Sequence, residues 1–170
     1  MERKGLIYII RSLSLLKKEN ISLIVIGRGI DENYFKREAE KNGVGDLIRF
    51  AGQREDIHKF YASADIFVLP AIYEPFGMAI AEAMASGLPV VVSRQTGISE
   101  IISDGEDGIL LDRPDAPEEI AHRLLPLIRD SEMRLKIGQR ARKKAESLSW
   151  DLIAEETMRV YINLKNKNLI

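Results

Sequence analysis

The sequence predicts an α/β fold, a parallel sheet of about five strands with helices on both faces. Short apolar runs alternate along the chain with longer segments in which apolar residues recur every three or four positions. Strands and helices that alternate in this way form parallel sheets, because each helical crossover returns the chain to the same edge of the sheet. The run at 21–26 is apolar enough to be buried on both faces. The runs expected as strands are residues 21–26, 47–51, 65–69, 90–92 and 107–112.

The helical segments lie between these runs and after the last of them. The final helix follows Ser149, a favourable N-cap residue, and carries one apolar stripe. We therefore expect two parts, an α/β domain over residues 1–148 and a helical tail over residues 149–170. The expected helices are residues 6–16, 32–42, 55–64, 77–85, 98–102, 115–128, 131–145 and 149–164.

Composition excludes several classes of function. The 170 residues carry a net charge of −1, with 30% charged residues of mixed sign, which argues against a nucleic-acid partner. The sequence has no cysteine, so disulfides and thiolate metal sites are excluded. No apolar run approaches the roughly 20 residues of a membrane span and no signal peptide opens the chain, so a cytoplasmic location is expected. The basic helix at 131–145 leaves peripheral attachment to the inner membrane face open, although it lacks a bulky apolar face.

The stretch at 72–92 is the candidate functional site. The strand before it ends at Pro70, so Glu74 lies in a loop at that strand's carboxyl end. A helix follows over 77–85, and Gly87 ends it before the next strand. Parallel α/β sheets bind ligands at the carboxyl ends of their strands, so this loop and helix N-terminus are expected to face a ligand.

The chemistry of this stretch suits a sugar joined through a diphosphate to a nucleoside. The free amides of residues 76–79 carry partial positive charge that favours a phosphate, and Gly77 lets the backbone approach it closely. Glu82 shares a helix face with Met78 about one turn further on, where its carboxylate can accept hydrogen bonds from a ribose diol. Glu74 then points at the glycosyl end of the ligand.

These residues resemble a known family. Glu74-Pro-Phe-Gly-Met-Ala-Ile-Ala-Glu82 is similar to the Glu-x7-Glu signature of retaining GT-B glycosyltransferases. The branch concerned contains glycogen synthase, sucrose-phosphate synthase and bacterial envelope mannosyl- and glucosyltransferases. A bare Glu-x7-Glu occurs often by chance, but this one lies between a buried strand and an Ala-x-Gly-x-Pro-Val segment at 85–90. The alternative is two solvated glutamates that flank an ordinary helix.

The resemblance implies a role for each residue of the signature. Glu82 would hold the ribose. Glu74, the candidate catalytic residue, would hold the transferred sugar together with the backbone amides of Phe76, Gly77 and Met78. The family needs no metal, and the nucleotide-sugar is a substrate, so the resemblance implies no cofactor.

Two further positions match the family. Lys4-Gly5 resembles the Lys-Gly that holds the donor diphosphate together with an arginine on the preceding strand. That strand would lie before Met1, and Arg3 is too close to Lys4 to replace the arginine. Arg54 follows another predicted strand, at the place where the family binds the nucleotide base, and could stack on that base. For Lys4 and Arg54 the alternative is an ordinary solvated side chain.

The resemblance covers nearly the whole chain and implies the Rossmann-like, donor-binding half of a GT-B enzyme. Such an enzyme moves a hexose from a nucleotide-diphosphate-sugar to a carbohydrate or lipid acceptor. The acceptor-binding N-terminal domain is missing, so the chain is expected to be inactive alone. It would be either a piece of a longer enzyme or the partner of a separate chain, and its last helix would cross to the missing domain.

An α/β domain of this kind can also serve other functions. A non-catalytic nucleotide-sugar-binding or regulatory module would keep the same fold. An oxidoreductase domain is disfavoured, because Gly27-Arg-Gly29 lacks the third glycine and the acidic residue of a dinucleotide fingerprint. The residues do not distinguish the nucleotide base, the donor sugar or the acceptor. Uridine, adenosine and guanosine diphosphates all suit the same residues.

Overall fold

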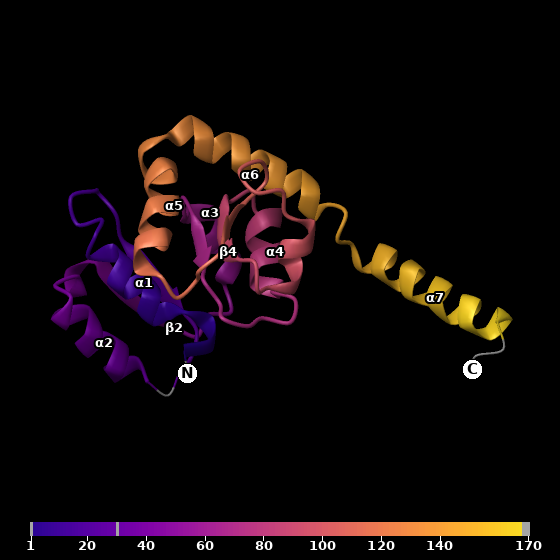
Figure 1. Ribbon diagram of the computed structural model, residues 1–170, viewed down its shortest axis with the longest axis horizontal. Coiled ribbons are helices and arrows are strands. Elements are labelled where there is room, and N and C mark those ends of the chain that lie inside the picture. The colour runs from indigo at the N-terminus through magenta and orange to yellow at the C-terminus, as the bar shows by residue number, and fades with distance from the viewer. Residues whose placement is uncertain (1, 30, 168–170) are drawn as a thin grey trace.

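Five parallel strands form the centre of the protein, but they lie in two sheets. In the computed structural model, which describes residues 2–29 and 31–167, β1 pairs with β2, and β4 lies between β3 and β5 (Figure 1). The predicted α/β fold is thus confirmed, with the difference that the sheet is divided between β1 and β3. The strands are β1 (Leu23–Ile26), β2 (Ile48–Gly52), β3 (Phe67–Leu69), β4 (Val90–Ser93) and β5 (Ile109–Leu111).

Helices connect the strands and cover the sheets. The helix expected at 98–102 is instead a 3₁₀ turn, because the segment is short and its hydrogen bonds span three residues, as from Ile102 N to Ser99 O at 3.2 Å. The α-helices are α1 (Leu6–Leu13), α2 (Glu32–Lys41), α3 (Ile57–Ser63), α4 (Met78–Ala85), α5 (Pro117–Arg129), α6 (Ser131–Ala145) and α7 (Trp150–Asn166). The 3₁₀ helices are η1 (Glu2–Lys4), η2 (Gly45–Leu47) and η3 (Gly97–Ile101).

The main core lies on both faces of β4. Val90 and Val92 pack with Ile80 of α4 on one face, whereas Val91 packs with Leu124 of α5 on the other. This alternation is the period of a strand that is covered on both sides. Because the three valines have no exposed surface, β4 is the most firmly held strand of the molecule.

The prediction that residues 21–26 are buried on both faces is wrong. Ile24 of β1 is 47% exposed, and Phe67, Val68 and Leu69 of β3 are only half-buried. Both strands are edges, since β1 pairs only with β2 and β3 pairs only with β4 among the described strands. Each therefore lacks the second neighbour that covers β4.

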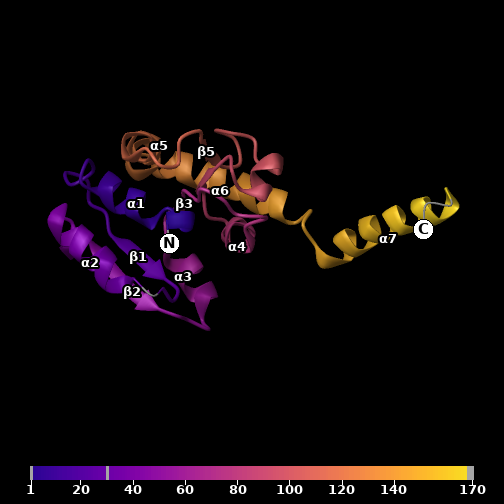
Figure 2. The same cartoon turned by 60° about the horizontal axis from the view of Figure 1, so that its bottom comes forward.

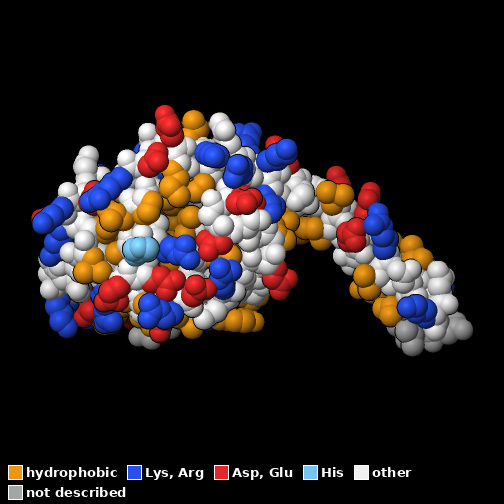
Figure 3. Space-filling model, turned by 45° about the horizontal axis from the view of Figure 1, so that its top comes forward, with side chains coloured by type: hydrophobic (Ala, Val, Ile, Leu, Met, Phe, Trp, Pro, Cys, Tyr) orange, Lys and Arg blue, Asp and Glu red, His pale blue; other side chains and the backbone are white. Residues whose placement is uncertain are grey.

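The tail helix α7 projects from the rest of the chain in both views (Figure 1 and Figure 2). None of its described residues is buried, although Trp150, Val160 and Tyr161 are large and apolar. Figure 3 shows hydrophobic side chains along this helix among the charged ones. None of the described helices is long and apolar enough to cross a membrane. The division into residues 1–148 and 149–170 remains a prediction.

We predict that Gly138→Ala destabilises the fold, because α6 passes directly over the turn that ends α4. A Cβ at residue 138 would lie 2.1 Å from the Gly87 carbonyl oxygen and 3.4 Å from Pro89 Cδ. Relief requires α6 to move, which should cost about 1–3 kcal/mol and lower the melting temperature by several degrees. Gly29→Ala is the control, since a Cβ there meets nothing within 4 Å. Equal melting temperatures for both variants would contradict the close packing of α6.

Candidate functional site

The N-terminus of α4 presents a set of free backbone amides. Gly77 precedes the helix with φ of +105°, and a Cβ there would lie 2.7 Å from the Cδ1 atom of Ile80. Only glycine fits both this left-handed conformation and this space. Among the described residues, the amides of 76–79 donate no hydrogen bond to the protein. These donors therefore form a ready anion site at the positive end of the helix.

Backbone hydrogen bonds join the loop that carries Glu74 to the loop after β4. The amide of Gly97 donates to the Glu74 carbonyl at 3.0 Å, and the amide of Ile98 donates to the Phe76 carbonyl at 2.9 Å. A longer contact of 3.4 Å runs from the Glu74 amide to the Gln95 carbonyl. The loop after β4 therefore fixes the backbone position of Glu74.

Glu74 forms an ion pair with Lys4. The ammonium of Lys4 contacts the Oε2 atom of Glu74, whose side chain is 14% exposed, against 56% for Lys4. Partial burial, and then the nearby Arg3 guanidinium, lower the pKa of Lys4. Arg3 itself lies over the Tyr73 ring at 5.6 Å. The Lys4 ammonium thus pairs with the carboxylate of Glu74, the candidate catalytic residue. The sequence did not indicate this pairing.

Glu82 is held by a residue that sequence reasoning missed. The hydroxyl of Tyr61 on α3 donates to the Oε2 atom of Glu82 at 3.0 Å and lies 3.4 Å from the Ala79 carbonyl. Burial, and then the hydrogen bond and charge of Glu82, raise the pKa of Tyr61 well above its usual value, so it stays a neutral donor. A buried tyrosine needs a partner for its hydroxyl, which was the available signal. The Glu82 carboxylate is consequently oriented before any ligand binds.

Arg54 lies at the carboxyl end of β2, away from the two glutamates. Its guanidinium donates to both oxygens of Asp56, at 3.0 and 3.2 Å, and its Cζ atom lies 5.3 Å from the centre of the Phe60 ring. The hydrogen bond and charge of Asp56 raise the pKa of Arg54. Among the described residues it contacts neither Glu74 nor Glu82. Asp56 and Phe60 therefore hold the planar guanidinium of Arg54 in place at the end of β2.

The structure brings most of the predicted site residues together. Lys4, Glu74 and the amides of Phe76, Gly77 and Met78 form one group, with Glu82 further along α4 on the same segment. Arg54 stands apart, on the end of the other sheet. No group of three or more potential metal ligands occurs among residues 2–29 and 31–167. The site therefore combines the Lys4 ammonium and two carboxylates with the free backbone amides of residues 76–79, which we call the amide cradle.

Comparison with known proteins identifies the family. The family described as Glycosyl transferases group 1 matches residues 1–144. The chain belongs to this family. The uncharacterized glycosyltransferase MJ1607 of Methanocaldococcus jannaschii is 38% identical to this chain over 163 residues, which is 94% of the chain and 42% of that protein. The chain thus spans less than half the length of that relative.

Solved structures agree with this assignment. The C-terminal domain of a glycosyl transferase group 1 family protein (LpcC) from Francisella tularensis is 28% identical, with a TM-score of 0.76, over 86% of this chain and 80% of that one. The Anabaena protein HepE in complex with UDP-glucose is 25% identical, with a TM-score of 0.81, over 98% of this chain and 46% of that one. The likeness confirms that this chain has the Rossmann-like fold of a GT-B half.

We predict that Gly97→Ala separates the two loops at the candidate site. A Cβ at residue 97 would lie 2.1 Å from the Pro75 carbonyl oxygen, so the two loops must separate. The amides of Gly97 and Ile98, which donate across the loops, should then exchange with deuterium at least tenfold faster. Gly29→Ala is the matched control and should leave these amides unchanged. Unaltered protection in Gly97→Ala would show that the loops are not held by this contact.

Proposed function

We propose that the chain is the donor-binding half of a retaining glycosyltransferase that moves a hexose from a nucleotide-diphosphate-sugar to a carbohydrate or lipid acceptor. One observation carries the proposal. The free amides of residues 76–79 at the N-terminus of α4 follow Glu74 in the chain and precede Glu82, which is about one turn further along the helix. A diphosphate on the amides would have its two ends directed at the two carboxylates.

The nucleoside end of the donor is assigned to Glu82. A ribose diol offers two hydroxyl donors, and a carboxylate accepts both. Tyr61 occupies the Oε2 atom of Glu82 at 3.0 Å and so fixes the plane of the carboxylate that the ribose would meet. The base would then extend toward Arg54, whose guanidinium is already stacked on Phe60 and can stack on a base with its other face.

The reacting end of the donor is assigned to Glu74 and Lys4. When the sugar leaves, negative charge grows on the diphosphate, and the amides of 76–79 with the Lys4 ammonium are donors that stabilise it. Glu74, covered by its neighbours, would accept hydrogen bonds from the sugar hydroxyls and orient the anomeric carbon. Donor binding would insert phosphate oxygens beside the Lys4 ammonium, which then bridges the diphosphate and Glu74.

The acceptor side of the reaction is assigned to a second domain. Apolar side chains around the site stay uncovered, since Tyr73 is 57% exposed and Met78 is 47% exposed. The helix α7 likewise leaves its apolar residues uncovered. A domain opposite the site would cover these surfaces and exclude water from the reacting atoms. HepE, whose structure holds UDP-glucose, is about twice the length of the aligned part, which supports such an arrangement.

We predict that Glu82→Ala weakens nucleoside diphosphate binding by roughly 10- to 100-fold, because a charge-assisted hydrogen bond contributes about 1.5–3 kcal/mol. Calorimetric titration with uridine, adenosine and guanosine diphosphates would measure the loss and identify the base. Tyr61→Phe should weaken binding only about 2- to 10-fold, since it removes the orienting bond and leaves the carboxylate.

Glu132→Ala is the control for this series, because Glu132 is exposed at the start of α6 and far along the chain from the site. It should bind like the parent. If Glu82→Ala is folded and binds as tightly as Glu132→Ala, the ribose assignment is wrong.

We predict that the 170-residue chain alone binds donor but transfers no sugar. Positioning of an acceptor at the anomeric carbon can contribute about 7–11 kcal/mol to catalysis, and none of the described site residues supplies that position. The purified chain would be incubated with each nucleotide-sugar and a panel of acceptors, and diphosphate release and product mass followed. Slow donor hydrolysis, lost in Glu74→Ala, is the most that we expect.

Addition of an N-terminal half, fused or as a separate chain, provides the decisive comparison. Transfer that appears only in the combined protein supports the proposal. Multiple turnovers by the 170 residues alone would show that the chain is not half of an enzyme. Donor binding without turnover in every combination would favour a non-catalytic nucleotide-sugar-binding or regulatory module.

A further inference from the structure

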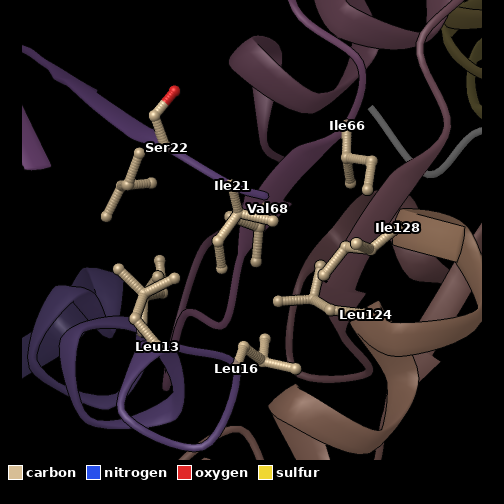
Figure 4. Close-up of a pocket in the computed structure, with 10 residues that line it drawn as sticks. Leu13, Leu16, Ile21, Ser22, Ile66, Val68, Leu124 and Ile128 are labelled. Carbon is tan, nitrogen blue, oxygen red and sulfur yellow. The ribbon is translucent and has the colours of Figure 1, made fainter. Parts of the chain in front are cut away.

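Two of the hollows on the described part of the chain differ in kind. One borders β1 and β3 and is apolar except for Ser22, and Figure 4 shows Ile21, Val68 and Leu124 among the side chains around it. The other lies beside α6, and none of its lining residues is apolar. They are Glu106, Asp107, Arg140, Lys143, Lys144 and Ser147. The second hollow therefore contains charged groups that the site does not use.

Lys144 and Asp107 form an ion pair at the edge of this second hollow. The Lys144 ammonium lies 2.8 Å from the Oδ2 atom of Asp107, whose side chain is 8% exposed. The Oδ1 atom of the same carboxylate accepts a hydrogen bond from the Ser103 amide at 2.7 Å. No other charged residue among 2–29 and 31–167 is buried. Because a buried carboxylate needs a partner, Asp107 holds the ammonium in place.

The same ammonium contacts the last carbonyl of η3. It donates to the Ile101 carbonyl oxygen at 2.7 Å, and Ile101 is the residue at which η3 ends. The final carbonyls of a helical turn lack partners within the turn and carry partial negative charge, which a cation stabilises. Lys144 thus joins α6 to the carboxyl end of η3.

The other end of η3 belongs to the candidate site. The amides of Gly97 and Ile98 donate to the carbonyls of Glu74 and Phe76, at 3.0 and 2.9 Å. At about three residues per turn, the five residues of η3 make less than two turns. A shift of the Ile101 carbonyl would therefore reach the two amides that hold the Glu74 loop.

The helix α6 is a firm support for Lys144. Its Gly138 lies against the turn after α4, where an added Cβ would be 2.1 Å from the Gly87 carbonyl oxygen. Arg134 also donates to the carbonyls at the end of α5, at 2.6 and 3.1 Å. Lys143, the residue next to Lys144, is exposed, and its side chain has no partner among the described residues.

We propose that Lys144 is a positioning residue of the candidate site, which clamps the end of η3 and so fixes the loop that carries Glu74. Its effect on the donor rests on the proposed function, whereas the clamp itself does not. Because Glu82 is held separately by Tyr61, loss of the clamp should affect the glycosyl end of the donor more than the nucleoside end.

Deuterium exchange of the full chain tests the clamp without a ligand. The double variant Lys144→Met/Asp107→Asn removes the ammonium and leaves no unpaired buried charge. The amides of Gly97 and Ile98 should then exchange at least tenfold faster, while the Val91 amide in the buried strand β4 keeps its rate. The single variant Lys144→Gln makes the same test, because its shorter side chain cannot reach both partners.

Two further variants show whether the effect belongs to this cation. Lys143→Met is the matched control and should keep the parent exchange rates. Lys144→Arg should restore most of the protection, since a guanidinium also donates to a carbonyl and a carboxylate, and the hollow beside it leaves room for the larger group.

Calorimetry tests the role at the site. Uridine, adenosine and guanosine diphosphates and their glucose derivatives would be titrated into the parent and each variant. In the double variant, the affinity for the glucose derivative relative to its diphosphate should fall about threefold or more, and Lys143→Met and Lys144→Arg should keep the parent ratio. A fold that is merely less stable would weaken both ligands alike.

The results separate this inference from the proposed function. Parent-like exchange of Gly97 and Ile98 in the double variant and in Lys144→Gln would overturn the clamp. Faster exchange with an unchanged affinity ratio would overturn the role at the site, since Lys144 would then serve the fold alone. A parent that binds none of the ligands would overturn the proposed function and the role of Lys144 toward the donor, while the exchange rates would still decide the clamp.

Discussion

The contact between the backbone segments 74–76 and 95–98 determines the shape of the site. The register of β3 against β4, Leu69 opposite Val92, brings the two loops out of the sheet side by side. The chain must then turn sharply into α4, and the left-handed Gly77 allows that turn without a side chain in the way. The free amides of residues 76–79 therefore belong to backbone that the hydrogen bonds between the loops hold in place, so an anion would meet donors already in position.

Burial divides the molecule into a firmly held part and a less covered one. The strand β4 has neighbours on both edges and helices on both faces, whereas β1 and β3 are half-exposed. The amide cradle and Glu82 belong to the first part, and Arg54, at the end of β2, belongs to the second. A donor that contacts all three would span both sheets. Its affinity would then depend on how rigidly the sheets are joined, as well as on the contacts themselves.

The order of elements, and the position of Glu74 and Glu82 on one loop-and-helix segment, were predictable because their signals are local. Strand runs, helical spacing and the pair Glu74 and Glu82 all lie within short windows of sequence. The contacts of Glu82 with Tyr61, and of Lys4 with Glu74 70 residues away, depend on tertiary packing and leave no local pattern. The division of the sheet was missed for a related reason. Composition predicts that a run such as 21–26 can be buried on both faces, but it does not tell whether a neighbouring strand is present to bury it.

The short segment η1 connects the loop after β3 to the candidate site. Arg3 is hydrogen-bonded to Ile72 at the carboxyl end of β3, and the next residue, Lys4, contacts Glu74. The hydrogen bond at Arg3 therefore fixes the backbone next to Lys4, whose ammonium is held against the Glu74 carboxylate. The sheet that carries Arg54 is separate from the sheet next to Glu74 and Glu82. If a donor contacted both groups, anything that fixed the two sheets in that arrangement would tighten donor binding by the free energy with which the donor fixes the sheets.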